Sequence, residues 1–111
     1  MLYILNQETS FDILIGQSFE LIVLYFTAEW CGPCKLIWPE VQKISEKNPN
    51  SILFIKIDVD EFEDLSSSCD VSCMPTFQFY RRNQKDKIDI LEVSSKEELI
   101  NKCRSHIQNY N

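Results

Sequence analysis

The chain has 111 residues, of which 44% are hydrophobic, so we predict a single domain over residues 1–111 with a buried core. Its formal net charge of −6, without a basic patch, argues against nucleic acid as a partner. No apolar run reaches the roughly eighteen residues of a membrane span, and the short apolar start does not resemble a signal peptide. Five cysteines, an odd number, indicate a reducing compartment. We therefore expect a cytoplasmic protein, and a leader cleaved from a longer precursor stays open.

Strand and helix patterns alternate along the first half of the chain. The first strand is predicted over Leu2–Leu5, and a short helix follows, with Asn6 as its N-cap and Gly16 at its end. A second strand covers about Glu20–Phe26 because its residues are apolar, β-branched and aromatic. Helical spacing then predicts a helix over Gly32–Lys47.

The second half begins with the nearly continuous apolar run Ile52–Asp58, which predicts a strand covered on both faces. Asp60 and Glu63 are spaced to cap a short helix that ends near Ser68. A fourth strand is predicted over Thr76–Tyr80.

The hairpin turn 81–84 follows, in which Asn83 tolerates a positive φ, and the fifth strand covers about Lys87–Val93. Ser94 and Glu97 form a predicted capping box for the final helix, and residues 108–111 are expected to fray. The order βαβαβαββα predicts an α/β fold with a mixed sheet.

A cysteine pair stands between the second strand and the helix after it. Cys31 lies near the first helical turn, where unpaired N–H groups and the helix dipole favour an anion. Because the thiolate is the nucleophile, this position activates Cys31, and Cys34 can attack a mixed disulfide formed there. Gly32 allows a tight turn, and Pro33 fixes its own φ and lacks an N–H that would be orphaned.

Two other interpretations of the pair stay open. It is half of a zinc site if two further ligands join it, or it is a structural disulfide, although a two-residue loop contributes little chain entropy. The remaining zinc-ligand candidates are Cys69, Cys73, Cys103 and His106. No second C-x-x-C exists, so the pattern favours redox chemistry, and we predict no metal.

The segment Ala28–Lys35 resembles the active-site signature of the thioredoxin family. Ile57–Asp60 is similar to the strand end that follows the active-site helix in that family, and Cys73–Phe77 is similar to its cis-proline loop. The resemblance covers nearly the whole chain. It implies the thioredoxin fold, a mixed five-stranded sheet flanked by four helices, and a cis peptide bond before Pro75.

The resemblance also implies a function, the reduction of protein disulfides. Cys31 is the expected nucleophile and Cys34 the resolving cysteine. The expected partners are disulfide-containing client proteins and a flavin- and NADPH-dependent thioredoxin reductase, with no cofactor bound to this chain. We expect a monomer, and a redox-dependent dimer through Cys73 stays open. The residues assigned to the active-site turn or to substrate docking are Trp30, Gly32, Pro33, Lys35, Cys73, Met74, Pro75 and Glu92.

The chain departs from the family at two places. Tyr25 stands where relatives carry a buried aspartate thought to help proton transfer, and Lys56 matches a lysine that lies near that carboxylate. A phenol, with an ordinary pKa near ~10, is a poor base, so we hypothesise slow deprotonation of Cys34. Glycine is also missing before the last helix, where Leu91–Val93 would narrow the docking groove.

Three further residues receive expectations. Cys73 is either a regulatory thiol or an idle surface thiol, and both stay open. Cys103 is expected in the core and His106 on the surface.

Two other function classes also remain: a binding module of the same fold with weak redox turnover, and an oxidase or isomerase of secretory compartments. Gly-Pro between the cysteines and the lack of a signal argue against the latter.

Overall fold

The computed structural model describes residues 1–8, 10–92 and 95–111. The strands are β1 (Leu2–Ile4), β2 (Leu21–Thr27), β3 (Ile52–Asp58), β4 (Thr76–Tyr80) and β5 (Asp89–Glu92). The helices are α1 (Phe11–Ile15), α2 (Gly32–Lys47), α3 (Glu63–Ser68) and α4 (Lys96–His106). This order confirms the predicted succession of elements, and the bounds of α2, β3 and β4 agree with the prediction residue for residue. The predicted end of the last strand, Val93, lies outside the described residues.

The five strands form one mixed sheet in the order β1-β3-β2-β4-β5. β3 runs parallel to β1 and β2, whereas β4 is antiparallel to both β2 and β5. The carboxyl ends of β2 and β3 and the amino end of β4 therefore lie at the same edge of the sheet. Thr27 is paired with Asp58 there, and Thr76 is paired with Phe26 on one side and Glu92 on the other. The segment after β2, which holds the cysteine pair, and the segment before β4 therefore meet at this edge.

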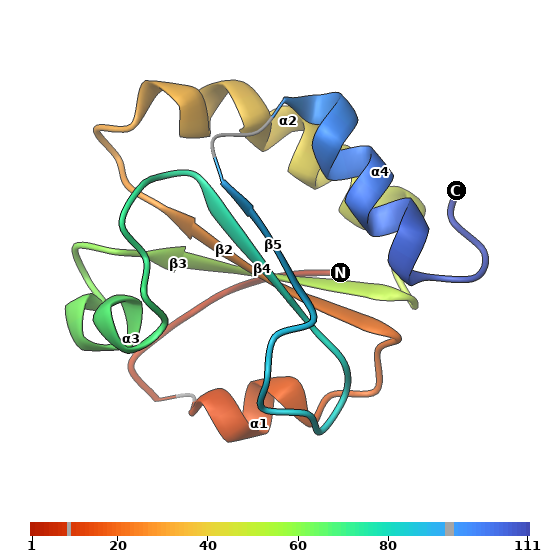
Figure 1. Cartoon of the computed structure of the whole chain (residues 1–111), viewed down its shortest axis with the longest axis horizontal. Helices are drawn as coiled ribbons and strands as arrows, with labels where there is room; N and C mark the ends of the chain where they lie inside the picture. The colour runs from red at the N-terminus through yellow and green to blue at the C-terminus, as the bar shows by residue number, and fades with distance from the viewer. Residues whose placement is uncertain (9, 93–94) are drawn as a thin grey trace.

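Helices cover both faces of the sheet, α2 and α4 on one and α1 and α3 on the other (Figure 1). Side chains of β2 alternate between these two layers because successive residues of a strand point to opposite faces. Val23 and Tyr25 belong to the core under α2 and α4, and Ile22 and Leu24 belong to the core under α1 and α3. All seven residues of β2 are buried, so the strand that leads into the cysteine pair is held from both sides.

Three predicted caps are wrong. The side chain of Ser10, not Asn6, caps α1 by accepting the N–H of Ile13. No side chain caps α3. The capping box of α4 lies one residue later than predicted: Ser95 accepts the N–H of Glu98, whose carboxylate reaches back to it. Ser94 lies outside the described residues.

The prediction for the hairpin turn is confirmed, and the prediction for the chain end is wrong. Asn83 has φ 60°, as predicted, and its N–H donates to Ile15 O at 2.8 Å. The predicted fraying of 108–111 is wrong, because Asn111 N donates to Asn48 Oδ1 at 2.9 Å and Tyr110 packs against the core. None of the helices in the described part of the chain is long and apolar enough to cross a membrane.

Candidate active site

Cys31 and Cys34 form a disulfide at the amino end of α2, with a Cα–Cα distance of 5.3 Å. Cys31 is the N-cap of the helix, and its sulfur accepts the N–H of Cys34 at 3.1 Å. Both residues are buried, with exposed fractions of 3% and 2%. The sulfur of Cys31 therefore occupies the place of a capping oxygen. On reduction the same N–H and the helix dipole favour its thiolate.

The two residues between the cysteines differ in what the turn requires of them. Pro33 lies in the first helical turn, where a missing N–H costs nothing, as predicted. Gly32 does not have a positive φ, and a Cβ built on it would meet no atom within 4 Å. The turn itself does not require glycine, which corrects the expectation for Gly32. Its lack of a side chain instead leaves open space beside Cys31.

The loop before β4 packs on the disulfide. Met74 contacts the small cluster of Ala28, Cys31 and Cys34, and the Met74–Pro75 peptide bond is cis, as the resemblance implied. The hydroxyl of Thr76 donates to Cys73 O at 2.6 Å, which closes this loop onto the start of β4. Met74 thus lies next to the cysteine pair, and Pro75 follows it in the same loop.

Cys73 lies partly buried beside a carboxylate. Its thiol donates to Glu92 Oε2 at 3.4 Å, across the Thr76–Glu92 pair of β4 and β5. Burial, followed by the hydrogen bond and charge of Glu92, raises the pKa of the Cys73 thiol, while a contact with Thr76 opposes the rise. The surroundings of Cys73 therefore favour the neutral thiol.

Trp30 is 66% exposed and lies directly before the cysteine pair. Its indole Nε1 donates to Asp60 Oδ2 at 2.8 Å, which ties the active-site loop to the loop after β3. Asp60 was predicted as a helix cap, and that role is wrong. Asp58 instead accepts the N–H groups of Asp60 and Glu61 at 2.9 and 3.4 Å. No local pattern in the sequence indicates this contact, because the parallel pairing of β2 with β3 in the fold brings Asp60 near Trp30.

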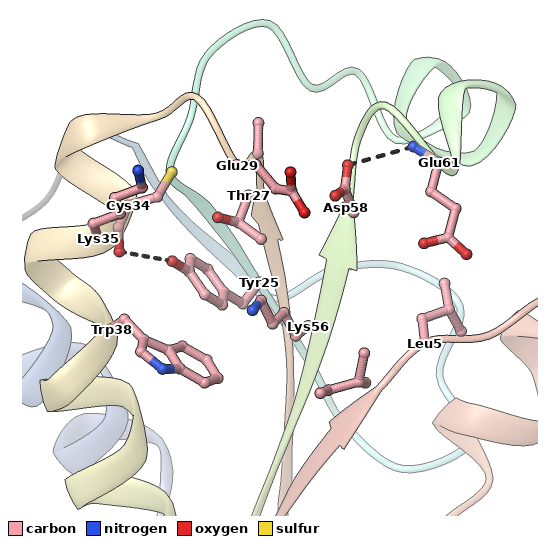
Figure 2. Close-up of a pocket in the computed structure, with 12 residues that line it drawn as sticks. Leu5, Tyr25, Thr27, Glu29, Cys34, Lys35, Trp38, Lys56, Asp58 and Glu61 are labelled. Carbon is pink, nitrogen blue, oxygen red and sulfur yellow. Dashed lines mark hydrogen bonds between the residues drawn. The ribbon is translucent and has the colours of Figure 1, made fainter.

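Tyr25 contacts the backbone of Cys34. Its buried hydroxyl donates to Cys34 O at 3.1 Å, as Figure 2 shows. Its ring stacks on Phe77 with centroids 4.8 Å apart. Burial raises the pKa of Tyr25, so the phenol stays neutral and serves as a hydrogen-bond donor.

A cavity of about 590 Å³ opens behind the disulfide. Cys34 and Trp38 line it from α2, Tyr25 lines it from β2, and Lys56 and Asp58 line it from β3 (Figure 2). The Lys56 ammonium lies 4.4 Å from the centroid of the Trp38 ring. Lys56 therefore has a partner, a cation–π contact that the sequence reasoning missed. The i, i+4 spacing of Cys34 and Trp38 places both on one helix face, but only the pairing of β3 with β2 brings Lys56 to that face.

The other candidate ligands lie far from the pair in the fold. Cys69 ends α3, packed in the core under α1 and α3, and Cys103 is buried in the core under α2 and α4, where burial raises its pKa to about 12. His106 Nε2 lies 2.8 Å from Asp89 Oδ2 and is partly buried, which corrects its expected surface position. Within the described ranges, no group of three or more His, Cys, Asp or Glu side chains is arranged to hold a metal ion.

The thioredoxin family model matches residues 3–105. The thioredoxin of Homo sapiens is 44% identical over 82 residues, which cover 73% of this chain and 77% of that protein. The thioredoxin of Ophiophagus hannah is 49% identical over 86 residues, covering 77% and 81%. Among solved structures, the oxidised thioredoxin of Plasmodium falciparum superposes with a TM-score of 0.80 at 32% identity, covering 95% of this chain and 97% of that one. The thioredoxin of Malassezia sympodialis gives a TM-score of 0.84 at 31% identity, covering 96% and 90%.

Proposed function

Because the chain belongs to the thioredoxin family, a family of thiol–disulfide oxidoreductases, we propose that it reduces disulfide bonds in other proteins through Cys31 and Cys34. The observation that carries this proposal is the sulfur of Cys31 at the N-cap of α2, where it accepts the N–H of Cys34 at 3.1 Å. A backbone donor and a helix dipole at one sulfur lower the free energy of its thiolate relative to its thiol.

The proposed exchange takes two steps. The Cys31 thiolate attacks one sulfur of a client disulfide, so that a mixed disulfide forms and the other client sulfur leaves as a thiolate. Cys34 then loses its proton and attacks the Cys31 sulfur, which releases the second client sulfur and leaves Cys31–Cys34 oxidised. Two electrons pass to the client, and the oxidised pair must be reduced again.

Docking is assigned to the surface formed by Trp30, Cys73, Met74 and Pro75. Its support is the packing of Met74 on the cysteine cluster and the exposure of Trp30 beside it. Among the residues that the structure describes, none forms a hydrogen bond with the backbone of Met74. That backbone is available to pair with an extended client segment, as in recognition by strand addition.

Thioredoxins bind no cofactor of their own, and electrons from NADPH reach them through a reductase. We assign the recharging of this chain to such a thioredoxin reductase in a reducing compartment, the cytoplasm. Three free cysteines, Cys69, Cys73 and Cys103, support that compartment. Fractionation of cells under alkylating conditions tests it, and recovery of the chain in an oxidising compartment would contradict it.

We propose a monomer, with a Cys73-linked dimer as the alternative. The contact of Cys73 with Glu92 supports the monomer because it favours the thiol over the reactive thiolate. Intact mass after mild oxidation separates the two, since a dimer or adduct that disappears in Cys73→Ser would establish a regulatory thiol.

Tyr25 favours a second candidate function, a binding module with weak redox turnover. Its neutral phenol donates to Cys34 O and is no base for the Cys34 thiol, which slows the second step. Tyr25→Asp should then speed turnover near neutral pH. An unchanged rate would remove the argument from position 25, and tight client binding independent of the redox state would favour the module.

Steady-state reduction of a model protein disulfide, with a chemical thiol as electron source, tests the proposed reductase. Wild type should turn over and Cys31→Ser should not, whereas Cys34→Ser should accumulate a mixed disulfide detectable by mass. Cys69→Ser removes a cysteine remote from the pair and serves as the matched control. If wild type shows no more turnover than Cys31→Ser, the reductase proposal is wrong.

A further inference from the structure

The carboxylate of Glu92 lies at the edge of the surface assigned to docking. Glu92 ends β5 opposite Thr76, the residue that follows the Met74–Pro75 loop. Its Oε2 accepts the Cys73 thiol at 3.4 Å, so the strand pairing and this contact both place it. Met74 in turn packs on the cysteine cluster. A negative charge therefore stands one strand away from the loop along which a client segment would lie.

The opposite side of the cysteine pair is also acidic. The Asp60 carboxylate accepts the Trp30 indole N–H at 2.8 Å, so it stays beside the exposed ring. Within the described ranges, neither Asp60 nor Glu92 forms an ion pair with a basic side chain of this chain. The formal net charge of −6 adds a field of the same sign. A client segment on this surface thus meets two carboxylates that no basic side chain of the described residues holds in an ion pair.

The two carboxylates differ in what they are free to do. Asp60 already bonds a charge-neutral donor that orients Trp30, so its removal would disturb the ring as well as the charge. Within the described ranges, the one hydrogen bond to the Glu92 carboxylate comes from a weak thiol donor, and Glu92 is exposed.

We propose that Glu92 is a specificity-determining residue that favours client segments carrying Lys or Arg next to the reacting cysteine and disfavours acidic ones. This inference rests on the proposed disulfide reduction and concerns the choice of client. An exposed charge pair contributes about 0.2–1 kcal/mol, which corresponds to a preference of up to about fivefold. A second copy of this chain, with its own acidic surface, is a poor occupant for the same reason.

Peptide disulfides that differ at one residue test the inference. Two peptides carry Lys or Glu beside the reacting cysteine, and the reduced protein is mixed with each at low and at physiological ionic strength. Wild type should react about fivefold faster with the Lys peptide at low ionic strength, and salt should shrink the ratio. Glu92→Gln should bring the ratio close to one, and Glu92→Asp, which keeps the charge, should retain most of it.

The matched control is Glu46→Gln, which removes the same charge from an exposed position. Glu46 lies near the far end of α2, about 20 Å from Cys31 along the helix axis at 1.5 Å per residue. This variant should keep the wild-type ratio. A ratio that survives in Glu92→Gln, or that falls equally in Glu46→Gln, overturns the inference. If wild type reacts with neither peptide, the proposed function fails first, so the two failures are distinguishable.

Discussion

Cys31 and Cys73 lie on the same edge of the sheet but in opposite surroundings. Cys31 is almost fully buried, yet its sulfur accepts a backbone N–H at the start of α2. Cys73 is less buried, yet its thiol donates to a carboxylate and its pKa is raised. The first sulfur has a donor that favours its anion, and the second has an acceptor that favours its neutral form. Exposure alone therefore does not rank the two thiols, because their hydrogen-bond partners act in opposite directions.

The largest expected effect is the difference in alkylation between the two thiols. In the reduced protein at neutral pH, iodoacetamide should modify Cys31 at least about tenfold faster than Cys73, because each unit of pKa difference changes the thiolate fraction about tenfold. Peptide mapping by mass spectrometry gives both rates from one sample. Equal rates would mean that the backbone donor and the carboxylate do not control the two sulfurs.

Removing the Tyr25 hydroxyl should destabilise the first turn of α2, where Cys34 lies. Tyr25→Phe leaves the buried Cys34 carbonyl without the phenol donor, so the free energy of unfolding should fall by about 1 kcal/mol. Urea denaturation measures it. Tyr110→Phe removes a hydroxyl from a ring that packs on the core and under Arg104, and it should leave stability within about 0.5 kcal/mol of wild type. If Tyr110→Phe lowered the free energy of unfolding as much, the loss in Tyr25→Phe could not be assigned to the hydrogen bond with Cys34.

Glu92→Gln should change the surroundings of Cys73 and leave those of Cys31 unchanged. Without the carboxylate, the pKa of Cys73 falls toward its ordinary value, and alkylation of Cys73 near neutral pH should speed up by about threefold. Burial, the larger cause of the raised pKa, stays in place and limits the effect. Cys31 reports the control rate in the same sample. An unchanged Cys73 rate would contradict the role given to Glu92.

The smallest expected effect lies at Asp89, between β5 and α4. Burial alone would raise its pKa, but the hydrogen bonds from Lys102 at 2.7 Å and from His106 at 2.8 Å lower it overall. A carboxylate with a lowered pKa stabilises the fold above about pH 4, and that stability is lost as pH falls through the folded-state pKa.

Asp89→Asn should therefore reduce stability at neutral pH by at most about 1 kcal/mol and flatten its acid dependence, while both sulfurs keep their alkylation rates. Urea denaturation over a pH series measures the first two effects. Asp12→Asn, which removes an exposed ion pair with Lys85, serves as the control and should leave stability unchanged. A wild-type stability that does not fall below about pH 4 would contradict the role of Asp89.

Most of the fold was predictable because its signals are local. The apolar run of β3 and the spacing of α2 gave their bounds correctly, since burial on both faces and helical periodicity are written into consecutive residues. The predicted capping box of α4 was one residue too early, because two serines and two glutamates are adjacent in that segment. The sequence offers both registers, and the packed position of the helix selects Ser95 and Glu98.

The parts of the site that join distant segments were not predictable. Trp30 with Asp60 and Trp38 with Lys56 each join α2 or its loop to β3, and only the register of β2 against β3 brings them together. The prediction that residues 108–111 fray was wrong for the same reason, because the residue that anchors them, Asn48, lies 63 residues before Asn111 in the chain. The resemblance, in contrast, supplied the cis peptide bond before Pro75, which composition alone does not favour.

The chain's two tryptophans give it a built-in optical probe and an internal reference. Trp30 is largely in water beside the cysteine pair, so its fluorescence should shift to shorter wavelength when a client covers it. Trp38 stacks with Tyr25 and is covered by Lys56 on the side of the cavity, so its emission should change little on docking. Client binding can therefore be followed without any label, and a Trp30→Phe variant isolates the reference signal.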